Sequence, residues 1–423
     1  MTTLFQMTTK RLAVETASAT LKRLYWIERE LYRATAARHM ATANWDAKIM
    51  LPRHLWEDSL HADSLRTRVL ELRYPRRDVD QEPPTMLVAV LHELVKSRND
   101  AELLAGIYAV FKPALVEAYD AYLSGTDAVD DAPTIHVMRR IREEKRAQIA
   151  EGRALLAGLP SQAETATWTD HLTACLRAVG GLHGGAAPDP DLAAGSVRFS
   201  ARPGYQRPLT TARDPRFLPA VFSGPPWKTV TPLEKQVSLA INHANEMWAA
   251  EVPLMLAWEL DKMPWEFYRD VGRWAWDECR HSMMGVRRLQ AWGFEVGIDT
   301  PMVAEHYHAI ATEPPIAILA ALHGYEMDSP AWKKGLKESF EAMDDTVSAQ
   351  DCDYDWADEA IHLSFGRRWL TTLVDDEDEI EALAECGVGQ WQSWLATVVN
   401  QPGAYEPFGS RIKARLVAMT GAG

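Results

Sequence analysis

The chain has 423 residues, of which 47% are hydrophobic and 25% charged, and its formal net charge is −14. This length is sufficient for two or three domains with sizeable cores, and the acidic balance argues against a nucleic-acid partner. The sequence shows no apolar signal segment and no apolar run long enough to span a bilayer. We therefore expect a cytoplasmic protein without a membrane partner. The four scattered cysteines form no CxxC pair, so they indicate neither a zinc ribbon nor a disulfide framework.

Helical periodicity runs from about residue 20 to residue 159. Apolar residues recur at helical spacing in four segments that Pro or Gly residues separate. We therefore predict an N-terminal four-helix bundle over residues 1–159. A fifth helix is expected at 163–179, and Gly and Pro residues then become too frequent for a helix, so residues 160–232 are predicted as this helix plus a linker or cap.

The helical pattern returns at about residue 233 and continues through four further segments. A trailing helix follows the acidic run DDEDE, which begins at Asp375. Carboxylates favour a helix N-terminus, so that run needs no function of its own. We expect a second bundle with its trailing helix over residues 233–400 and a tail at 401–423. No segment has a strand pattern, so the predicted fold class is all-α with two four-helix bundles.

A short motif recurs in both halves, with two acidic residues followed three positions later by a histidine. It occurs as WEDSLH from Trp56, WDECRH from Trp276 and DEAIH from Asp358. The composition alone would give about 0.25 such matches. Residues three apart in a helix share one face and lie within about 6 Å at Cβ, so a Glu and a His at this spacing can bind one metal ion. The repetition therefore predicts a metal site.

The second bundle contains a full set of ligands for two metal ions. Such a site takes one Glu from each of two helices and a Glu-x-x-His pair from each of the other two. In each half a lone Glu precedes the paired Glu by 32 or 33 residues, so the two lie at equal height in a hairpin that turns near residue 262 or 343. The predicted ligands are Glu246, Glu278, His281, Glu326, Glu359 and His362. This oxygen-rich set favours two iron ions, manganese or a mixed pair over zinc or copper(I).

Glu251 is the alternative to Glu246 as the first lone ligand. Five residues place the two about 140° apart around a helix, so both cannot face the metals. Equal height in the hairpin favours Glu246. Pro330, four residues after Glu326, removes a backbone hydrogen bond, and we expect a kink there that opens room beside the site.

Four further residues lie next to the predicted ligands. His243 and His323 each precede a lone Glu by three residues and are either extra ligands, hydrogen-bond partners of ligands or structural histidines. Asp277 and Asp358 precede the paired Glu residues. Metal-bound imidazoles usually donate their other N–H to a carboxylate, so these Asp residues are candidates to orient the His ligands across to the opposite helix.

The first bundle resembles a degenerate copy of the second. Asp58 and His61 repeat the motif spacing, but Arg146 stands three residues after Glu143, where a second imidazole would be needed. A guanidinium cannot bind metal and could occupy the vacant charge position itself. The possible lone carboxylates are Glu28, Glu30 and Glu117. We predict that this bundle binds no metal and serves as a packing partner or substrate wall.

The two Glu…Asp-Glu-x-x-His units, at about residues 233–373, resemble the ferritin-like di-iron carboxylate superfamily. Bacterioferritins, acyl carrier protein desaturases and arylamine N-oxygenases carry similar units. The resemblance implies a pair of iron ions that activates O₂ or peroxide. An additional His one turn before the second Glu-x-x-His would suit an N-oxygenase, but Asp355 stands there.

The expected function is that of a non-haem di-iron oxygenase or oxidase. It would oxidise a small organic substrate with O₂ as co-substrate and an external electron donor, with no catalytic residue beyond the metal ligands. We expect this substrate between the two bundles, under the Gly/Pro-rich segment, and the 16 Trp residues either pack cores or line that cavity. The alternatives are iron oxidation or peroxide handling, a ribonucleotide reductase subunit with Tyr325 as a radical site, and a two-bundle scaffold without catalysis.

Overall fold

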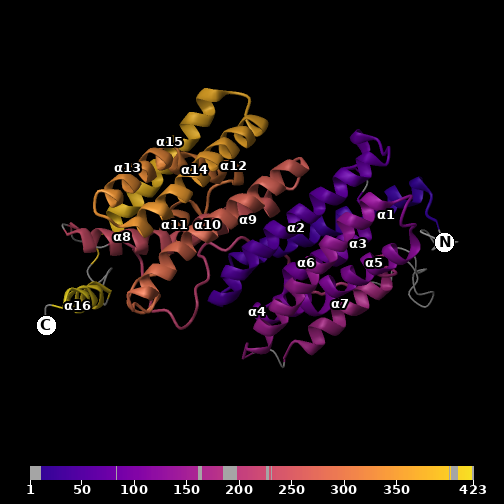
Figure 1. Ribbon diagram of the computed structural model, residues 1–423, viewed down its shortest axis with the longest axis horizontal. Helices are drawn as coiled ribbons and strands as arrows, with labels where there is room; N and C mark the ends of the chain where they lie inside the picture. The colour runs from indigo at the N-terminus through magenta and orange to yellow at the C-terminus, as the bar shows by residue number, and fades with distance from the viewer. Residues whose placement is uncertain are drawn as a thin grey trace, which may run out of the picture. The chain divides into compact units, whose positions relative to one another are not determined.

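The computed structural model describes residues 11–81, 83–160, 164–183, 198–224, 228–229, 231–399, 401 and 408–421. Over these residues the chain is all-α apart from an isolated bridge between Val296 and Thr300, which confirms the predicted all-α class. No helix in the described part is both long and apolar enough to cross a bilayer. The chain forms two compact units (Figure 1), one of Met1–Arg38 with His54–Gln206 and one of His39–Arg53 with Arg207–Gly423.

These units differ from the predicted domains in two places. The helix α2 (Trp45–Glu71) is continuous, but its residues 45–53 belong to the second unit. Trp45 and Ile49 pack there in a hydrophobic core with Ala244 and Val286. The predicted linker at 160–232 is divided after Gln206. Helical periodicity shows where a helix continues, but it cannot show which core each end of the helix enters. Residues 184–197 of that linker and 402–407 of the predicted tail lie outside the described residues.

The first unit contains the predicted long helices and several short ones. One predicted helix after residue 100 is instead two α-helices joined by the π-helical segment η3 (Gly106–Phe111). The expected fifth helix is present as α7, whereas α3 is too short for its periodicity to be read from the sequence. Besides α2, the elements are α1 (Val14–His39), η1 (Arg76–Asp78), α3 (Thr85–His92), η2 (Glu93–Lys96), α4 (Asp100–Ala105), α5 (Lys112–Gly125), α6 (Ala132–Ala157) and α7 (Ala166–Ala178).

The second unit is built on two helical hairpins that face each other. Its helices are α8 (Pro232–Asn245), α9 (Met247–Glu259), α10 (Trp265–Ala291), α11 (Glu305–Ile310), α12 (Pro315–Glu326), α13 (Ser329–Glu341), α14 (Thr346–Leu373), α15 (Glu377–Val398) and α16 (Phe408–Thr420). α10 packs against α8 and α9, α14 packs against α12 and α13, and α10 contacts α14. The turns at residues 260–264 and 342–345 fall where the equal-height argument requires them.

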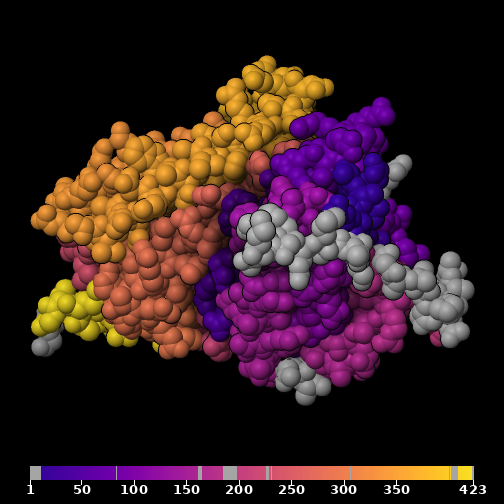
Figure 2. Space-filling model, turned by 45° about the vertical axis from the view of Figure 1, so that its right-hand side comes forward, coloured from indigo at the N-terminus to yellow at the C-terminus, as the bar shows by residue number. Residues whose placement is uncertain are grey.

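Two local features position α10. A Cβ atom at Gly285 would lie 2.3 Å from Ala240 O, so only glycine allows α10 to approach α8 this closely. At the end of α10, Leu289 and Phe294 pack against Ile412 of α16, and the yellow α16 lies beside this segment in Figure 2. α10 is therefore held on both sides.

Candidate metal centre

The two lone carboxylates lie at helix breaks. Glu246 is the junction between α8 and α9, and Glu326 is the last residue of α12. The kink predicted at Pro330 is instead a break, because α13 starts at Ser329 and Pro330 lies in its first turn, where the missing N–H costs no helical hydrogen bond. Each break brings a carboxylate to the helices that carry the Glu-x-x-His pairs.

Four predicted ligands surround one point, which we call position A. They are Glu278, Glu326, Glu359 and His362, and one ligand atom from each lies within 4.8 Å of the others. His362 Nδ1 is 3.0 Å from Glu278 Oε1 and 3.5 Å from Glu359 Oε2. All four residues are buried. The geometry therefore offers three carboxylates and one imidazole to a single cation.

A second point, position B, lies on the other side of Glu278. Glu246, Glu278 and His281 place ligand atoms within 4.8 Å of one another. His281 Nδ1 is 3.7 Å from Glu246 Oε2 and 3.5 Å from Glu278 Oε2. Glu278 thus directs one oxygen toward each position, as a carboxylate that bridges two metal ions does.

Asp355 also faces position B, and the sequence reasoning did not identify it as a ligand. Its Oδ1 lies 3.7 Å from His281 Nδ1, and the side chain is fully buried. A signal was available, since Asp355 lies four residues before Glu359 and seven before His362 on one face of α14. In the sequence this position appeared only as a departure from the N-oxygenase pattern.

Lys333 of α13 is the second residue that the sequence analysis missed. Its ammonium lies 2.9 Å from Glu246 Oε1, contacts Asp355 Oδ2 and lies 4.0 Å from Glu359 Oε1. The side chain is only 2% exposed. Nothing in the sequence distinguishes it from the exposed Lys334 of the same helix.

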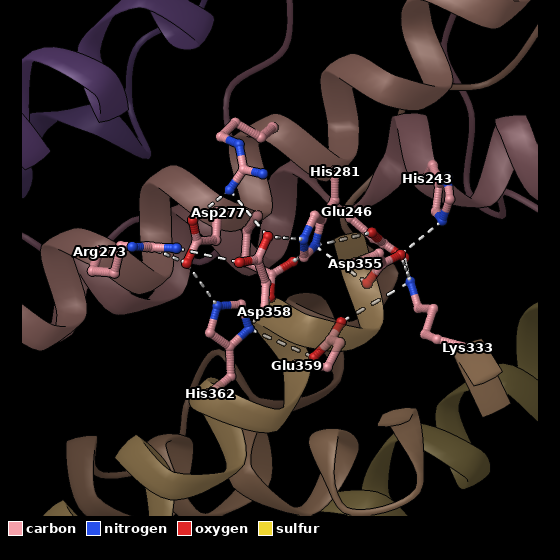
Figure 3. A network of polar contacts seen from close by, with 12 residues as sticks. His243, Glu246, Arg273, Asp277, His281, Lys333, Asp355, Asp358, Glu359 and His362 are labelled. Carbon is pink, nitrogen blue, oxygen red and sulfur yellow. Dashed lines mark hydrogen bonds and ion pairs between the residues drawn. The ribbon is translucent and has the colours of Figure 1, made fainter. Parts of the chain in front are cut away.

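The two Asp residues that precede the paired Glu residues cross to the opposite helix. Asp358 Oδ2 lies 3.3 Å from His281 Nε2, and Asp277 Oδ2 lies 3.5 Å from His362 Nε2 (Figure 3). Each imidazole therefore faces a carboxylate with Nε2 and turns Nδ1 toward the cluster. This is the arrangement expected for carboxylates that orient metal-bound histidines.

Two arginines that the sequence analysis did not assign bind the same pair of Asp residues. Arg280 Nη1 donates to Asp277 Oδ1 at 2.6 Å and to Asp358 Oδ2 at 3.0 Å. Arg273 also donates to both, at 2.5 and 3.2 Å (Figure 3). The charges of Asp277 and Asp358 are thus compensated by guanidinium groups.

The two additional histidines differ in position. His243 Nε2 lies 2.9 Å from Asp355 Oδ2, so it contacts a residue at position B. His323 belongs to none of the potential ligand groups found among the described residues. It packs instead on α14 at Gly366, where a Cβ atom would lie 2.5 Å from His323 Nδ1. The spacing to the lone Glu is the same for both histidines, but the direction in which each ring leaves the helix break is a tertiary property.

Glu251 lies apart from the cluster in a buried ion pair. Its carboxylate contacts Lys48 Nζ and lies 2.8 Å from Arg213 Nη1. Burial opposes ionisation, but Arg213 and Lys48 lower the pKa of Glu251 below its usual value. Of the two alternatives for the first lone carboxylate, the structure places Glu246 at the cluster.

Burial and neighbouring carboxylates together favour the protonated forms of several groups in the cluster. Burial raises the pKa of Glu246 to about 8, and burial together with Glu359 raises the pKa of Glu326 well above its usual value. Burial would lower the pKa values of His281 and His362, but their carboxylate neighbours raise both well above 6.5. Without a cation the cluster therefore tends to take up protons.

The donor atoms test whether metal ions would fit. Several buried atoms that face positions A and B have no hydrogen-bond partner among the described residues, namely Glu246 Oε2, Glu278 Oε1, His281 Nδ1, Asp355 Oδ1, Glu359 Oε2 and His362 Nδ1. A buried polar atom without a partner costs about 1–3 kcal/mol, so this many at one place call for cations. When both imidazoles are neutral, the four Glu ligands, Asp355 and the Lys333 ammonium have a summed charge of four negative units. Two divalent ions would balance this charge. The residues fit such a pair.

A cavity of about 320 Å³ opens beside the cluster. Carboxylates of both positions reach it, and aromatic residues form much of the remaining wall, notably Trp248, His306, Tyr325 and Trp332. The His306 ring stacks between Trp248 and Trp391 at centroid distances of 4.6 and 4.4 Å. The lining residues all belong to the second unit, and the cavity has the mixed apolar and polar wall of a small-molecule site.

The related cluster in the first unit has a different composition. Glu28, Asp58 and His61 place ligand atoms within 4.8 Å of one another, but the ammonium of Lys145 contacts both carboxylates and that of Lys112 lies 2.9 Å from Asp58. The cation that we expected from Arg146 is therefore Lys145, one residue earlier. Arg146 is 46% exposed and pairs with surface carboxylates, and Glu30 and Glu117 lie outside the cluster.

Residues 223–415 match the model of a family described as "Protein of unknown function (DUF455)". The matched segment contains every predicted metal ligand and excludes the first unit's cluster. Searches of curated proteins and of solved structures gave no match. Over about the second half of its length, the chain is thus similar to a family whose description assigns no activity.

Proposed function

We propose that the second unit binds two metal ions, at positions A and B, and is a non-haem oxidoreductase that oxidises a small organic molecule with O₂. The observation that carries this proposal is the convergence of unpartnered, buried carboxylate and imidazole atoms from separate helices. A metal-free core would have to keep these atoms unsatisfied or protonated, which is costly. Oxygen-rich ligands favour iron or manganese.

The chain's own residues perform three tasks in this proposal. Glu278 holds the two positions together, with one oxygen toward each. Asp358 accepts a hydrogen bond from His281 Nε2–H, and Asp277 Oδ2 lies 3.5 Å from His362 Nε2, so in this proposal the two carboxylates keep each Nδ1 directed inward. Iron or manganese ions bound there would supply the electrons that O₂ chemistry requires.

The cavity provides the place for the substrate. Its aromatic wall suits a flat, largely apolar molecule, which would exclude water from the ligand carboxylates when bound. An external electron donor would restore the reduced metals after each turnover. This substrate class follows from the lining alone.

Metal analysis and oxygen uptake test the proposal together. Protein from cells supplied with iron and manganese should contain about two ions per chain. With a reductant it should then consume more O₂ than the bound metal alone could reduce. Less than half an equivalent of metal would refute the metal site. Two bound metal ions without sustained O₂ consumption would refute the oxidoreductase and indicate a scaffold that binds metal without catalysis.

Two matched substitutions locate the metals. His281→Ala and His362→Ala should each lower the metal content, since each removes the imidazole of one position. His61→Ala, which removes the equivalent imidazole of the first unit, should leave it unchanged. Equal losses from all three variants would mean that the first unit also binds metal.

A further inference from the structure

Positions A and B differ in the charge that surrounds them. Among the described residues, the one ammonium within 4.0 Å of a position A carboxylate is that of Lys333, at this limiting distance from Glu359. At position B the same ammonium makes direct contact with both Glu246 and Asp355. The protein has therefore compensated part of the negative charge at B but hardly any at A.

The contacts at position B are divided between the two oxygens of each carboxylate. Glu246 Oε1 lies 2.9 Å from the Lys333 ammonium. Its Oε2 has no hydrogen-bond partner in the described part of the chain and lies 3.7 Å from His281 Nδ1. Asp355 Oδ2 contacts the Lys333 ammonium and His243 Nε2. Its Oδ1 has no hydrogen-bond partner among the described residues and lies 3.7 Å from His281 Nδ1. Figure 3 shows both carboxylates between His281 and Lys333. Lys333 thus contacts one oxygen of each carboxylate and leaves the other oxygen available at position B.

We propose that the two positions fill in order, A before B, because Lys333 is a resident counter-ion of the position B ligands. This inference rests on the proposed dinuclear site. The first ion meets Glu278, Glu326, Glu359 and His362 with no ammonium in direct contact. The second ion meets Glu246 and Asp355, whose charge is shared with Lys333, and is repelled by the ammonium across the two carboxylates.

The first unit shows how far an ammonium can replace a metal ion in this framework. There Lys145 lies 2.7 Å from Glu28 and contacts Asp58, and Lys112 also binds Asp58. These two ammonium groups balance the charges of the carboxylates Glu28 and Asp58. Position B lies between the first unit's cluster and position A in its charge balance, since one ammonium contacts two carboxylates that also face an imidazole.

Titration of the metal-free protein with Mn²⁺ tests the order of filling. Calorimetry should resolve two steps whose dissociation constants differ by at least about tenfold. The electron paramagnetic resonance spectrum should show isolated Mn²⁺ after one equivalent and a coupled pair after two. One step with equal constants, or a coupled pair from the first addition, would overturn the inference. No binding at all would refute the proposed function instead.

Lys333→Met tests the role of the ammonium. The dissociation constant of the second ion should fall by at least about tenfold while that of the first stays within about twofold. An unchanged or higher second constant would overturn the inference, because a lysine that merely positions Glu246 and Asp355 would weaken binding when removed. Lys337→Met is the matched control, since Lys337 belongs to the same helix and pairs with Glu341 at the surface. It should change neither constant.

Two more variants keep the test decisive if Lys333→Met does not fold. Lys333→Arg retains the positive charge and should retain two separate steps. Asp355→Asn should raise the second dissociation constant by at least about tenfold and leave the first step intact, because only position B uses Asp355. Loss of the first step alone in Asp355→Asn would reverse the assigned order and overturn the inference.

Discussion

The two units place the same acid-acid-x-x-His motif in a buried cluster but balance its charge in opposite ways. In the first unit, burial opposes the ionisation of Asp58, and the ammonium groups of Lys112 and Lys145 nevertheless lower its pKa. Burial in turn lowers the pKa of Lys112 to about 8. In the second unit, the cluster has five carboxylates, and the one ammonium beside them among the described residues, that of Lys333, lies within 4.0 Å of three.

The motif alone therefore does not make a metal site. Its spacing brings a carboxylate and an imidazole to one helix face in both units. The residues on the facing helices then decide whether the protein itself supplies the compensating charge or leaves it to a cation.

The largest effect is expected at the carboxylate between positions A and B. Glu278→Gln keeps the volume but removes the charge that both positions share, so metal content should fall from about two ions to less than half an ion per chain. Elemental analysis measures it. Glu144→Gln changes a carboxylate that binds His61 in the first unit and should leave the content unchanged. If Glu278→Gln kept two metal ions, the metal content would not depend on the charge of Glu278, and the proposed difference between the two units would be wrong.

The next effect separates the two alternative lone carboxylates. Glu246→Gln should lower the metal content by about one ion, because only position B uses this residue. Glu251→Gln should keep both ions but weaken the buried pair with Lys48 and Arg213, at a cost of up to about 3–5 kcal/mol in the free energy of unfolding. Metal analysis and urea unfolding distinguish these outcomes. The reverse pattern would make Glu251 the ligand.

A stability measurement tests the lysines of the first unit. Lys145→Met leaves Glu28 and Asp58 with too little positive charge and should lower the free energy of unfolding by about 3–5 kcal/mol, with metal content unchanged. Arg146→Met removes a half-exposed surface pair and should cost less than about 1 kcal/mol. Similar losses in the two variants would contradict the assignment of Lys145 as the resident cation.

The smallest expected effect is a pH dependence of the metal-free protein. Folding raises the pKa of Glu246 to about 8 and that of Glu326 well above its usual value, so each favours the folded state less as pH rises above the unfolded pKa near 4.5. The raised pKa values of His281 and His362 act in the same direction, since their stabilisation is lost as pH rises through the folded values.

The metal-free protein should therefore lose a few degrees in Tm between about pH 6 and pH 9, and bound metal should largely remove this loss. Calorimetry of metal-free and Mn²⁺-loaded protein checks it. A Tm that rises with pH in the metal-free state would contradict the excess of buried negative charge.

The features that depend on local helix geometry could be predicted from the sequence. Helical periodicity predicted the all-α fold and the helices that carry the motifs, and equal height in a hairpin selected Glu246 over Glu251 for a place beside Glu278. These inferences succeed because the rise and rotation per residue of a helix are constant. For the same reason the i,i+3 pair of Glu359 and His362 converges on one point.

The residues that complete the cluster from the facing helices depend on tertiary packing and could not be predicted from the sequence. Lys333 and Lys334 are adjacent in the sequence, yet one is buried against three carboxylates and the other is 55% exposed. Lys145 and Arg146 divide in the same way. A long charged side chain extends several bonds from its helix, so its partner depends on which helix packs opposite and at what rotation. That packing is a property of the whole unit, and it determines where the protein supplies its own positive charge.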